Sequence, residues 1–388
     1  METARGAAQA ERSANQVACL RFLAEAGEAR TVGMLSEGTG LSRPTVHAVL
    51  DDLLDAGLVE ATSPATAGPG RPARAFRFAR EAGLVAGVDL GPRGARAIIC
   101  DLSGRRVGYA ELRPDGAADL SLVARALDAA AGSLDLSGLR AVGVGLPGVV
   151  EADGRLRASL AMPDLVGLPV GELLAKELDQ PVVVDNDIKL AALAEQRGGA
   201  GRGYSDVVYL QIGHRLSVSI VLNGVIRQGR HRLAGELGAQ RGMRWTRNAQ
   251  RGQLVWSVRP TGAEVLAAAA AGDADAQAEL EDFCAQIAGR IATVLLVVDP
   301  EIVVVRGGPV EDSDALLRPL AAAVENELVF PERPPFVASA LGREAVVLGA
   351  VGNAFDRFSS DIYGVHDYPS PWSHITTPDP DIVERTSK

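Results

Sequence analysis

The spacing of apolar residues changes twice along this chain. Between residues 13 and 60 they recur every three or four positions, as on one face of a helix. From residue 84 to about residue 358, short apolar runs alternate with helical stretches, which is the pattern of strand, turn and helix. Residues 361–388 contain four prolines and show neither period, so we predict a C-terminal tail that is ordered only where it docks on the rest.

The first of these regions predicts three helices and a tight turn. Thr31 is placed to cap the second helix, which stops at the glycine-containing turn 38–40. Ser42 is placed to cap the third helix, with Pro44 tolerated in its first turn. The apolar stripe of this third helix, with spacings of three and four, consists of Val46, Val49, Leu50 and Leu53. This arrangement matches a helix-turn-helix.

The N-terminus of the third helix carries residues suited to DNA. With the apolar stripe facing the other helices, Arg43, Thr45 and His47 lie on the outer face, near the end that enters a major groove. Ser42 is placed to contact a phosphate, because the backbone amides at a helix N-terminus favour an anion. The alternative is a small three-helix bundle used for protein contacts, and composition alone leaves the two interpretations close.

A basic segment rich in glycine and proline follows the third helix. Residues 61–80 contain four arginines and no acidic residue. Gly70-Arg71-Pro72 is narrow and extended, so we expect Arg71 and Arg74 to enter a minor groove, where the potential is most negative. A solvated linker is the alternative, but beside a helix-turn-helix the segment favours a wing. We therefore predict that residues 1–80 form a winged helix-turn-helix domain that binds double-stranded operator DNA.

Composition and charge narrow the class of protein. A chain of 388 residues, 47% of them hydrophobic, is too long for one ordinary domain. Its net charge of −10 argues against a protein coated in nucleic acid, although residues 1–80 are neutral overall and allow a local DNA-binding element. Three widely spaced cysteines favour a reducing cytoplasm over a disulfide framework. Since no apolar run approaches the roughly 20 residues of a membrane span, we expect a cytoplasmic protein without a membrane partner.

The region after residue 80 divides into two similar halves. Residues 84–113 predict three strands joined by glycine-containing turns, an antiparallel meander, and a second meander opens at 207–224. Helices and single strands follow each meander. This repetition predicts an α/β, two-lobed, actin-like architecture with a cleft between lobes at 81–200 and 201–360.

Five motifs in a fixed order connect this region to a known family. They are GVDLG (87–91), GVGLPGVV (143–150), VVVDNDIKLAALAE (182–195), LNG (222–224) and AGELG (234–238). Together they resemble the ROK family (repressors, open reading frames and kinases), and the resemblance extends from about residue 13 to 358. Kinases of this family are sugar kinases with a ribonuclease H-like fold, and its regulators add an N-terminal winged helix. The resemblance implies a transcriptional regulator.

The stretches that resemble the family's phosphate-binding loops have lost most of their glycines. Such loops need small residues so that backbone amides can approach the phosphate oxygens. The first loop reads Gly91-Pro92-Arg93-Gly94, and its proline removes a donor. The second, 213–219, reads GHRLSVS in place of the family's GTGIGxG. Although Gly307-Gly308 resembles the adenosine loop, we predict no catalytic residue, no cofactor and no phosphoryl transfer from ATP.

The residues that resemble the family's sugar site are better preserved. Asn186 and Asp187 match the pair that binds sugar hydroxyls, and in the kinases this aspartate is also the general base. Glu236 matches a second carboxylate that accepts hydrogen bonds from the sugar. The alternative is that Asn-Asp only caps the helix at 188–195. The family histidine that binds both sugar and zinc is Ala239 here, and residues 240–253 lack Cys and His, so no metal site is expected.

These features predict a DNA-binding regulator, more specifically a repressor, whose degenerate kinase-like region senses a small effector. The effector would be a sugar, or a sugar phosphate that also reaches Arg215; alternatively, Arg215 forms an ion pair that fills the vacated nucleotide space. Two half-sites about one helical turn apart call for a homodimer or a dimer of dimers. Two alternatives stay open: an active ATP-dependent sugar kinase with an appended DNA-binding domain, and a regulator that senses no ligand.

Overall fold

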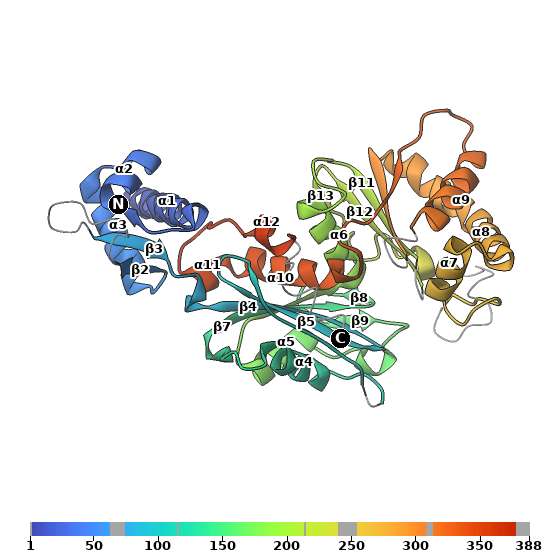
Figure 1. The fold of residues 1–388 in the computed structure, drawn as a ribbon, viewed down its shortest axis with the longest axis horizontal. Coiled ribbons are helices and arrows are strands. Elements are labelled where there is room, and N and C mark those ends of the chain that lie inside the picture. Colours follow the sequence, from blue (N-terminus) through green and yellow to red (C-terminus); the bar gives the residue numbers. More distant parts are fainter. Residues whose placement is uncertain are drawn as a thin grey trace.

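The chain forms a winged-helix domain at one end, a first α/β lobe in the middle and a second α/β lobe at the other end (Figure 1). The computed structural model describes residues 2–62, 74–114, 116–212, 215–239, 254–307 and 313–377. The predicted fold class, a two-lobed α/β region preceded by a winged helix-turn-helix, is confirmed.

Three helices and a small sheet make up the N-terminal domain. The elements are α1 (Glu2–Ala26), α2 (Val32–Thr39), α3 (Arg43–Asp55), β1 (Arg30–Thr31), β2 (Val59–Thr62) and β3 (Ala75–Phe78), with the antiparallel strand order β1-β3-β2. The Thr31 hydroxyl accepts a hydrogen bond from the Met34 amide at 3.4 Å, and the Ser42 hydroxyl accepts one from the Thr45 amide at 3.3 Å. Both predicted helix caps are therefore confirmed. The predicted apolar stripe of α3 is buried throughout.

A five-stranded sheet of order β10-β7-β4-β5-β6 forms the first lobe. Its strands are β4 (Leu84–Gly91), β5 (Gly94–Asp101), β6 (Arg106–Leu112), β7 (Leu139–Leu146) and β10 (Val182–Asn186). The first three are antiparallel, as the predicted meander requires, and β7 and β10 are added in parallel. Helices α4 (Ser121–Ala131) and α5 (Val170–Leu178) cover one face, and α6 (Asp187–Gly198) and α10 (Ala345–Arg357) cover the other (Figure 1). A short hairpin, β8 (Val149–Val150) and β9 (Leu156–Ala158), lies beside the sheet.

The second lobe repeats this plan with the strand order β13-β12-β11-β14-β15. Its elements are β11 (Val207–Ile212), β12 (Leu216–Leu222), β13 (Val225–Ile226), α7 (Gly262–Ala270), α8 (Ala274–Val298), β14 (Ile302–Arg306), α9 (Ser313–Asn326) and β15 (Phe336–Ala338). The predicted second meander, β11-β12-β13, is antiparallel, and β14 and β15 extend it in parallel. One apolar core lies between this sheet and the three helices.

Helix α10 belongs to the first lobe, so the predicted boundary of the second lobe at residue 360 is wrong. The helix packs on α6 and crosses β4 and β7 at close range. A Cβ at Gly143 would overlap the Ala350 carbonyl, and one at Gly87 would lie 2.6 Å from the Val347 carbonyl oxygen. Glycines in the middle of these strands therefore let the helix backbone approach the sheet.

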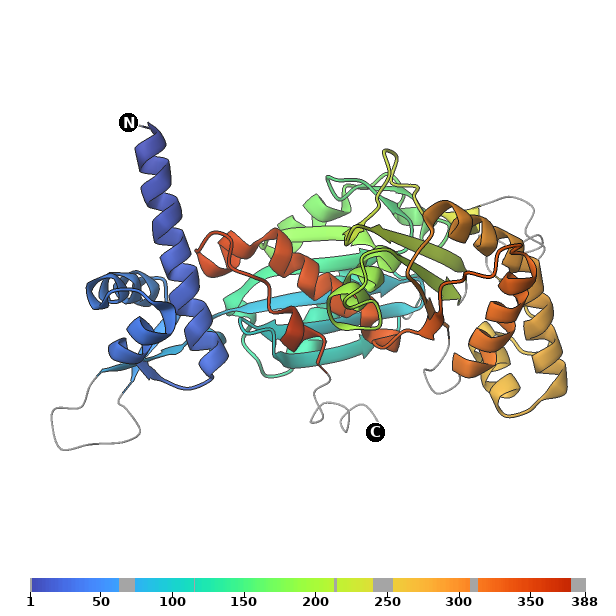
Figure 2. The same ribbon diagram turned by 90° about the horizontal axis from the view of Figure 1, so that it is seen from above.

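The C-terminal segment, residues 359–377, is docked on the rest of the chain. The described part of the predicted tail therefore meets the condition under which we expected it to be ordered. The segment forms two short helices: α11 (Ser359–Tyr363), next to the winged-helix domain, and α12 (Trp372–Ile375), which packs on α6 and α10 of the first lobe (Figure 2). Its aromatic and aliphatic side chains provide the apolar surface that the proline content obscures. Six of them are at most 8% exposed, namely Ile362, Tyr363, Val365, Tyr368, Trp372 and Ile375.

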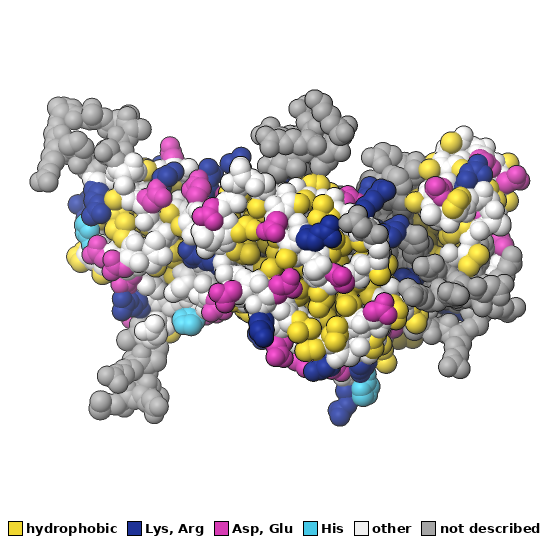
Figure 3. Space-filling model, turned by 90° about the horizontal axis from the view of Figure 1, so that it is seen from below, with side chains coloured by type: hydrophobic (Ala, Val, Ile, Leu, Met, Phe, Trp, Pro, Cys, Tyr) yellow, Lys and Arg dark blue, Asp and Glu magenta, His cyan; other side chains and the backbone are white. Residues whose placement is uncertain are grey.

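One apolar core connects the winged helix with the first lobe. It contains buried residues of α1 and α3, strands β4 and β5, helix α10 and the C-terminal segment. On the face seen in Figure 3, hydrophobic side chains gather over the middle of the molecule, with acidic and basic side chains interspersed. None of the described helices combines the length and apolar character needed to cross a bilayer.

Candidate DNA interface and ligand-binding cleft

The N-terminal end of α3 brings four predicted DNA-contacting residues together. Arg43 and His47 are exposed, Thr45 is partly exposed, and Ser42 precedes them. The Ser42 hydroxyl lies 2.8 Å from the Thr45 hydroxyl and also accepts the Thr45 amide, so its observed role is that of helix cap. Its contact with a DNA phosphate stays a prediction.

A salt bridge between α1 and α3 holds the candidate recognition helix in place. Arg12 of α1 donates to both carboxylate oxygens of Asp52 at 2.9 and 2.5 Å, and Gln16 donates to the same carboxylate at 3.1 Å. The hydrogen bond from Arg12 lowers the pKa of Asp52 below its usual value. Helix α3 packs against both α1 and α2, so both helices orient its outer face.

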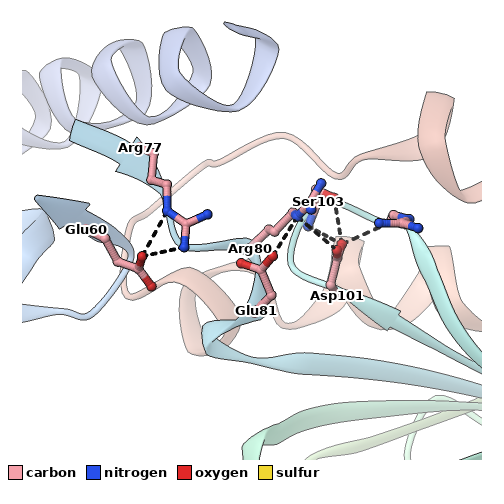
Figure 4. Close-up of polar contacts among 7 residues, drawn as sticks. Glu60, Arg77, Arg80, Glu81, Asp101 and Ser103 are labelled. Atoms are coloured by element: carbon pink, nitrogen blue, oxygen red, sulfur yellow. Dashed lines mark hydrogen bonds and ion pairs between the residues drawn. The ribbon is translucent and has the colours of Figure 1, made fainter. Parts of the chain in front are cut away.

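The wing arginines differ in how far their charge is neutralised. Arg77 of β3 pairs with Glu60 of the neighbouring strand at 2.7 Å, and Arg80 pairs with Glu81 at 2.9 Å (Figure 4). Arg74 instead lies over the Phe76 ring, 5.2 Å from its centroid, and has no carboxylate partner among the described residues. Arg71 lies outside the described residues. Among the described arginines of the segment, Arg77 and Arg80 are therefore paired with carboxylates and Arg74 is not. The entry of Arg71 and Arg74 into a minor groove stays a prediction.

The predicted cleft between the lobes is present, with a volume of about 1500 Å³. Its walls come from the β4–β5 turn, the loop before β8 and the start of α6 in the first lobe. The second lobe contributes the ends of β11 and β14 and the segment before residue 239. The three predicted ligand-binding residues, Asn186, Asp187 and Glu236, all line this cleft.

Asn186 is engaged within the protein as a helix cap. Its amide oxygen accepts from the Lys189 amide at 3.1 Å, and its amide nitrogen donates to the Gly148 carbonyl at 2.8 Å. The side chain is only 4% exposed. The capping interpretation of Asn186 is thus observed, with both polar atoms of its side chain bonded within the protein. Its contact with a ligand stays a prediction.

Asp187 and Glu236 are the free carboxylates of this part of the cleft. One Asp187 oxygen accepts from the Ile188 amide at 2.8 Å, and no described group donates to the other. Burial, together with the nearby negative charges of Asp89 and Glu236, raises the pKa of Asp187 to about 7. Burial also raises the pKa of Glu236, against the effect of Lys189. A carboxyl group with a pKa near neutrality, such as that of Asp187, can accept or donate a hydrogen bond, which suits hydroxyl ligands.

Lys189 joins the two lobes beside these carboxylates, and our sequence reasoning missed it. Its ammonium group is buried and donates to the Gln228 side chain at 2.8 Å and to the Arg232 carbonyl at 3.2 Å. Arg232 in turn lies 3.5 Å from Asp185 at the end of β10. A single lysine within the apolar run that begins α6 was the available signal, because a buried lysine needs partners.

The first phosphate-loop segment is a tight hairpin turn. Gly91 pairs with Gly94, which leaves Pro92 and Arg93 as the two turn residues. Gly94 has φ 147°, and a Cβ there would overlap the Leu112 carbonyl, so the turn lies close against β6. Of the second loop, residues 213 and 214 lie outside the described residues, as does Gly308. Arg215 is described, and its guanidinium donates to the Leu160 carbonyl across the cleft at 3.4 Å.

A cluster of arginines lines the same end of the cleft. Arg96, only 9% exposed, lies 3.3 Å from Glu111 and 3.7 Å from Asp89. Arg306, at the end of β14, donates to the Gln211 side chain at 2.6 Å. Sequence reasoning missed both residues, because their meeting depends on how strands from two lobes are placed. Within the described ranges no three His, Cys, Asp or Glu side chains are placed to hold a metal, and residues 240–253 lie outside those ranges.

Comparison with known proteins connects both parts of the chain to families. The ROK family model matches residues 85–253 and 242–355, and the MarR family model matches residues 12–68. The bifunctional enzyme NanE/NanK of Brucella suis biovar 1 is 32% identical over 228 residues, which is 54% of this chain but only 42% of that enzyme. The xylose repressor of Bacillus subtilis is 21% identical over 349 residues, 84% of this chain and 90% of the repressor.

Solved structures show the same fold. A ROK family transcriptional regulator, described as a homolog of the E. coli MLC protein, has a TM-score of 0.65 at 20% identity and covers 94% of this chain and 98% of its own. A ROK family glucokinase from Streptomyces griseus, in complex with glucose and AMPPNP, has a TM-score of 0.60 at 22% identity. It covers 71% of this chain, since its whole length matches the lobes without the winged helix.

Proposed function

The chain belongs to the ROK family, and from this premise we propose that it is a transcriptional repressor whose operator affinity changes when an effector binds between the lobes. The main observation behind the proposal is that one chain contains both an exposed candidate recognition helix and a large cleft between its two lobes. Arg43, Thr45 and His47 would contact bases, with Ser42 at a phosphate and Arg71 and Arg74 in the minor groove.

The cleft supports a ligand sensor better than a kinase. The two-residue turn at Pro92-Arg93 offers few backbone amides to a phosphate chain, because proline has no N–H. Arg306 occupies the region between Asp89 and Asp187, and its charge interacts with both. An enzyme would need open amides and a divalent cation at such carboxylates. We therefore propose that no ATP-dependent phosphorylation takes place, and that Asp187 and Glu236 bind hydroxyl groups of a sugar-type effector.

A continuous set of contacts supports coupling between the cleft and the DNA-binding domain. Helix α6 begins at Asp187 in the cleft and ends at Gly198, where it meets Thr376 of the C-terminal segment so closely that a Cβ would overlap. At its other end this segment contacts α1, because the Ser13 hydroxyl donates to the His366 carbonyl at 3.1 Å. The charge of Arg21 on the same helix also acts on Tyr368. Ligand binding that shifts α6 would thus move α1 and the recognition helix packed on it.

A dimer follows from the way such domains read DNA, since two half-sites need two recognition helices. The second lobe carries exposed apolar residues at the edge where α8 and α9 lead into β14 and β15. These residues are Leu296, Val297, Val329 and Phe330, and they are 64–94% exposed. Exposed apolar surface of this kind favours self-association, and we propose that this edge forms the dimer interface.

The test of the function is operator binding by the full chain. The probe is a fluorescent duplex from the promoter beside the gene, and binding is followed by anisotropy at several salt concentrations. Arg43→Ala and Arg74→Ala are expected to weaken binding by about 1–3 kcal/mol each. Arg318→Ala removes an exposed arginine of the second lobe and serves as the matched control. Equal affinity and equal salt dependence in all variants would refute DNA binding through this face.

The kinase alternative has its own test, motivated by the sugar kinases among the relatives. Calorimetric titration with Mg-ATP and a coupled assay with a panel of hexoses are expected to give neither binding nor turnover. Turnover in the wild type that disappears in Asp187→Asn would establish the kinase instead.

A further inference from the structure

The half of the cleft beyond Asp187 carries a local excess of positive charge. Four arginines meet there: Arg93 in the β4–β5 turn, Arg96 on β5, Arg306 at the end of β14, and Arg343 just before α10. Arg96 and Arg306 both donate to the Arg343 carbonyl, at 2.6 and 3.5 Å, so the group is connected. We call these four residues the arginine cluster. In a chain with a net charge of −10, such a concentration of one sign is unusual.

Two carboxylates neutralise half of the arginine cluster. Glu111 lies 3.3 Å from Arg96 and 3.2 Å from Arg343, and Asp89 lies 3.7 Å from Arg96. These short distances place two negative charges among Arg96 and Arg343. The same carboxylates are too far from the remaining two arginines to form ion pairs with them.

Arg93 and Arg306 form no ion pair with a described residue, although nearby carboxylates act on the charges of both. Neither has a carboxylate oxygen within 4 Å among the described residues, and the partners of Arg306 are a neutral amide and a carbonyl. Burial lowers the pKa of Arg306. The Arg93 side chain reaches solvent, but the cleft walls partly desolvate its guanidinium, which together with the charge of Arg343 lowers its pKa. Both arginines stay protonated at neutral pH, so the folded protein holds two cations in a region that disfavours them.

An anion bound between the lobes would remove this cost. Guanidinium groups bind phosphate oxygens through paired hydrogen bonds, and those bonds strengthen where water is excluded. Arg306 is also close enough to Asp187 for their charges to interact, so it borders the carboxylates that suit hydroxyl groups. One ligand would therefore reach both halves if it carried hydroxyls at one end and an anionic group at the other.

We propose that the arginine cluster binds the phosphate group of a phosphorylated sugar whose hydroxyls contact Asp187 and Glu236. This inference rests on the proposed function, since it names the chemical class of the effector. A neutral sugar fills only the carboxylate half and leaves Arg93 and Arg306 without an ion-pair partner. Mg-ATP fits less well, because the turn at Pro92 replaces the amide-lined loop that a triphosphate needs.

Calorimetric titration of the full chain tests the proposal with three kinds of probe at constant ionic strength: inorganic phosphate, a panel of hexose 6-phosphates, and the corresponding neutral hexoses. At least one phosphate ester is expected to bind at least tenfold more tightly than its neutral sugar. Arg93→Gln and Arg306→Gln are each expected to weaken binding of the ester at least tenfold more than they weaken binding of the neutral sugar. Arg318→Gln, which removes an exposed charge outside the cleft, is expected to change nothing.

Several outcomes would overturn the proposal. Equal affinity for ester and neutral sugar, unchanged ester binding in both cleft variants, or no binding of either ester or inorganic phosphate would each do so. Arg93 lies in an exposed turn, so Arg93→Gln remains informative even if Arg306→Gln does not fold. Operator binding by the chain without ligand tests the proposed function, and failure to bind operator refutes that function. Release of operator by a neutral sugar but by no phosphate ester overturns only the present inference.

Discussion

Replacing Trp372 by alanine is expected to separate ligand binding from DNA release, because this residue anchors the C-terminal segment. Its indole packs on α10, where a Cβ at Gly352 would overlap the ring, and its Nε1 donates to Asp356 at 3.1 Å. Only 8% of the residue is exposed. The segment that it anchors contacts α1 on one side and the end of α6 on the other.

The size of the effect follows from the area that the ring buries. A buried tryptophan removes roughly 150–250 Å² from water, which at about 25 cal/mol per Å² corresponds to roughly 4–6 kcal/mol. Substitutions of buried aromatic residues by alanine cost about 3–5 kcal/mol. Coupling between two ligand sites is typically about 1–3 kcal/mol. Because the anchoring energy exceeds the coupling energy, loss of the anchor is expected to abolish the coupling rather than reduce it slightly.

The assay measures operator affinity with and without the ligand that titrates into the cleft. In the wild type we expect the ligand to weaken operator binding by about 5- to 150-fold. In Trp372→Ala the ligand is expected to weaken it less than about twofold, while calorimetry shows unchanged affinity in the cleft. Trp372→Phe retains the packing and is expected to retain most of the response.

A matched control separates coupling from general destabilisation. Phe283 of α8 is fully buried in the second lobe, where its ring centroid lies 4.9 Å from that of Trp256. Phe283→Ala is expected to cost a similar free energy of unfolding and yet to keep ligand-dependent release. If Trp372→Ala, folded at the assay temperature, still released operator like the wild type, the C-terminal segment would not be the coupling element.

Three further predictions address stability and assembly. The pKa of Asp187 is about 7 in the folded protein, against about 3.9 in an unfolded chain. The folded state therefore binds more protons, so the free energy of unfolding falls as the pH rises from about 4 to about 7. Asp187→Asn should remove this pH dependence in urea titrations, and an unchanged dependence would contradict the assignment. The lowered pKa of Asp52 has the opposite sign. The stability that the Arg12 salt bridge adds is present above about pH 4, near the pKa of an unfolded aspartate, and is lost as the pH falls through the lower folded pKa. In chemical unfolding, Asp52→Asn is expected to lower the free energy of unfolding at pH 7, and the difference from wild type is expected to shrink as the pH falls below about 4. Phe330→Asp is expected to turn a dimer into a monomer in light scattering, whereas Val107→Asp, in the first lobe, should leave the mass unchanged.

Local features of this fold were predictable because their signals lie within a few residues. The caps Thr31 and Ser42 precede their helices directly, and the stripe of α3 follows one helical period. The meander 84–113 is likewise set by alternation and short turns. The placement of α10 was not predictable in this way, because its cause is the approach of Ala350 to Gly143, more than two hundred residues away. The sequence around Gly143, in the GVGLPG motif, does not indicate which helix will pack against it.

The candidate site residues show the same difference between what local sequence predicts and what depends on the fold. Arginines 71, 74, 77 and 80 look equivalent in sequence, yet the pairing of β2 with β3 sets Glu60 against Arg77 and leaves Arg74 without an acid. In the cleft, Asn186 and Asp187 are adjacent, but their side chains differ. The Asn186 oxygen caps α6 and its amide nitrogen donates to the Gly148 carbonyl, whereas one Asp187 oxygen accepts no hydrogen bond from a described residue. Arg306 ends a strand of ordinary composition, and its role in the cleft is visible only in the fold, where its charge interacts with that of Asp89. The local signals therefore identify the capping residues and turns of this chain, whereas the charges that line the cleft depend on how the two lobes are placed. We propose that these side-chain charges stand where a kinase would need backbone amides for a nucleotide, so that the cleft binds an effector instead of turning over a substrate.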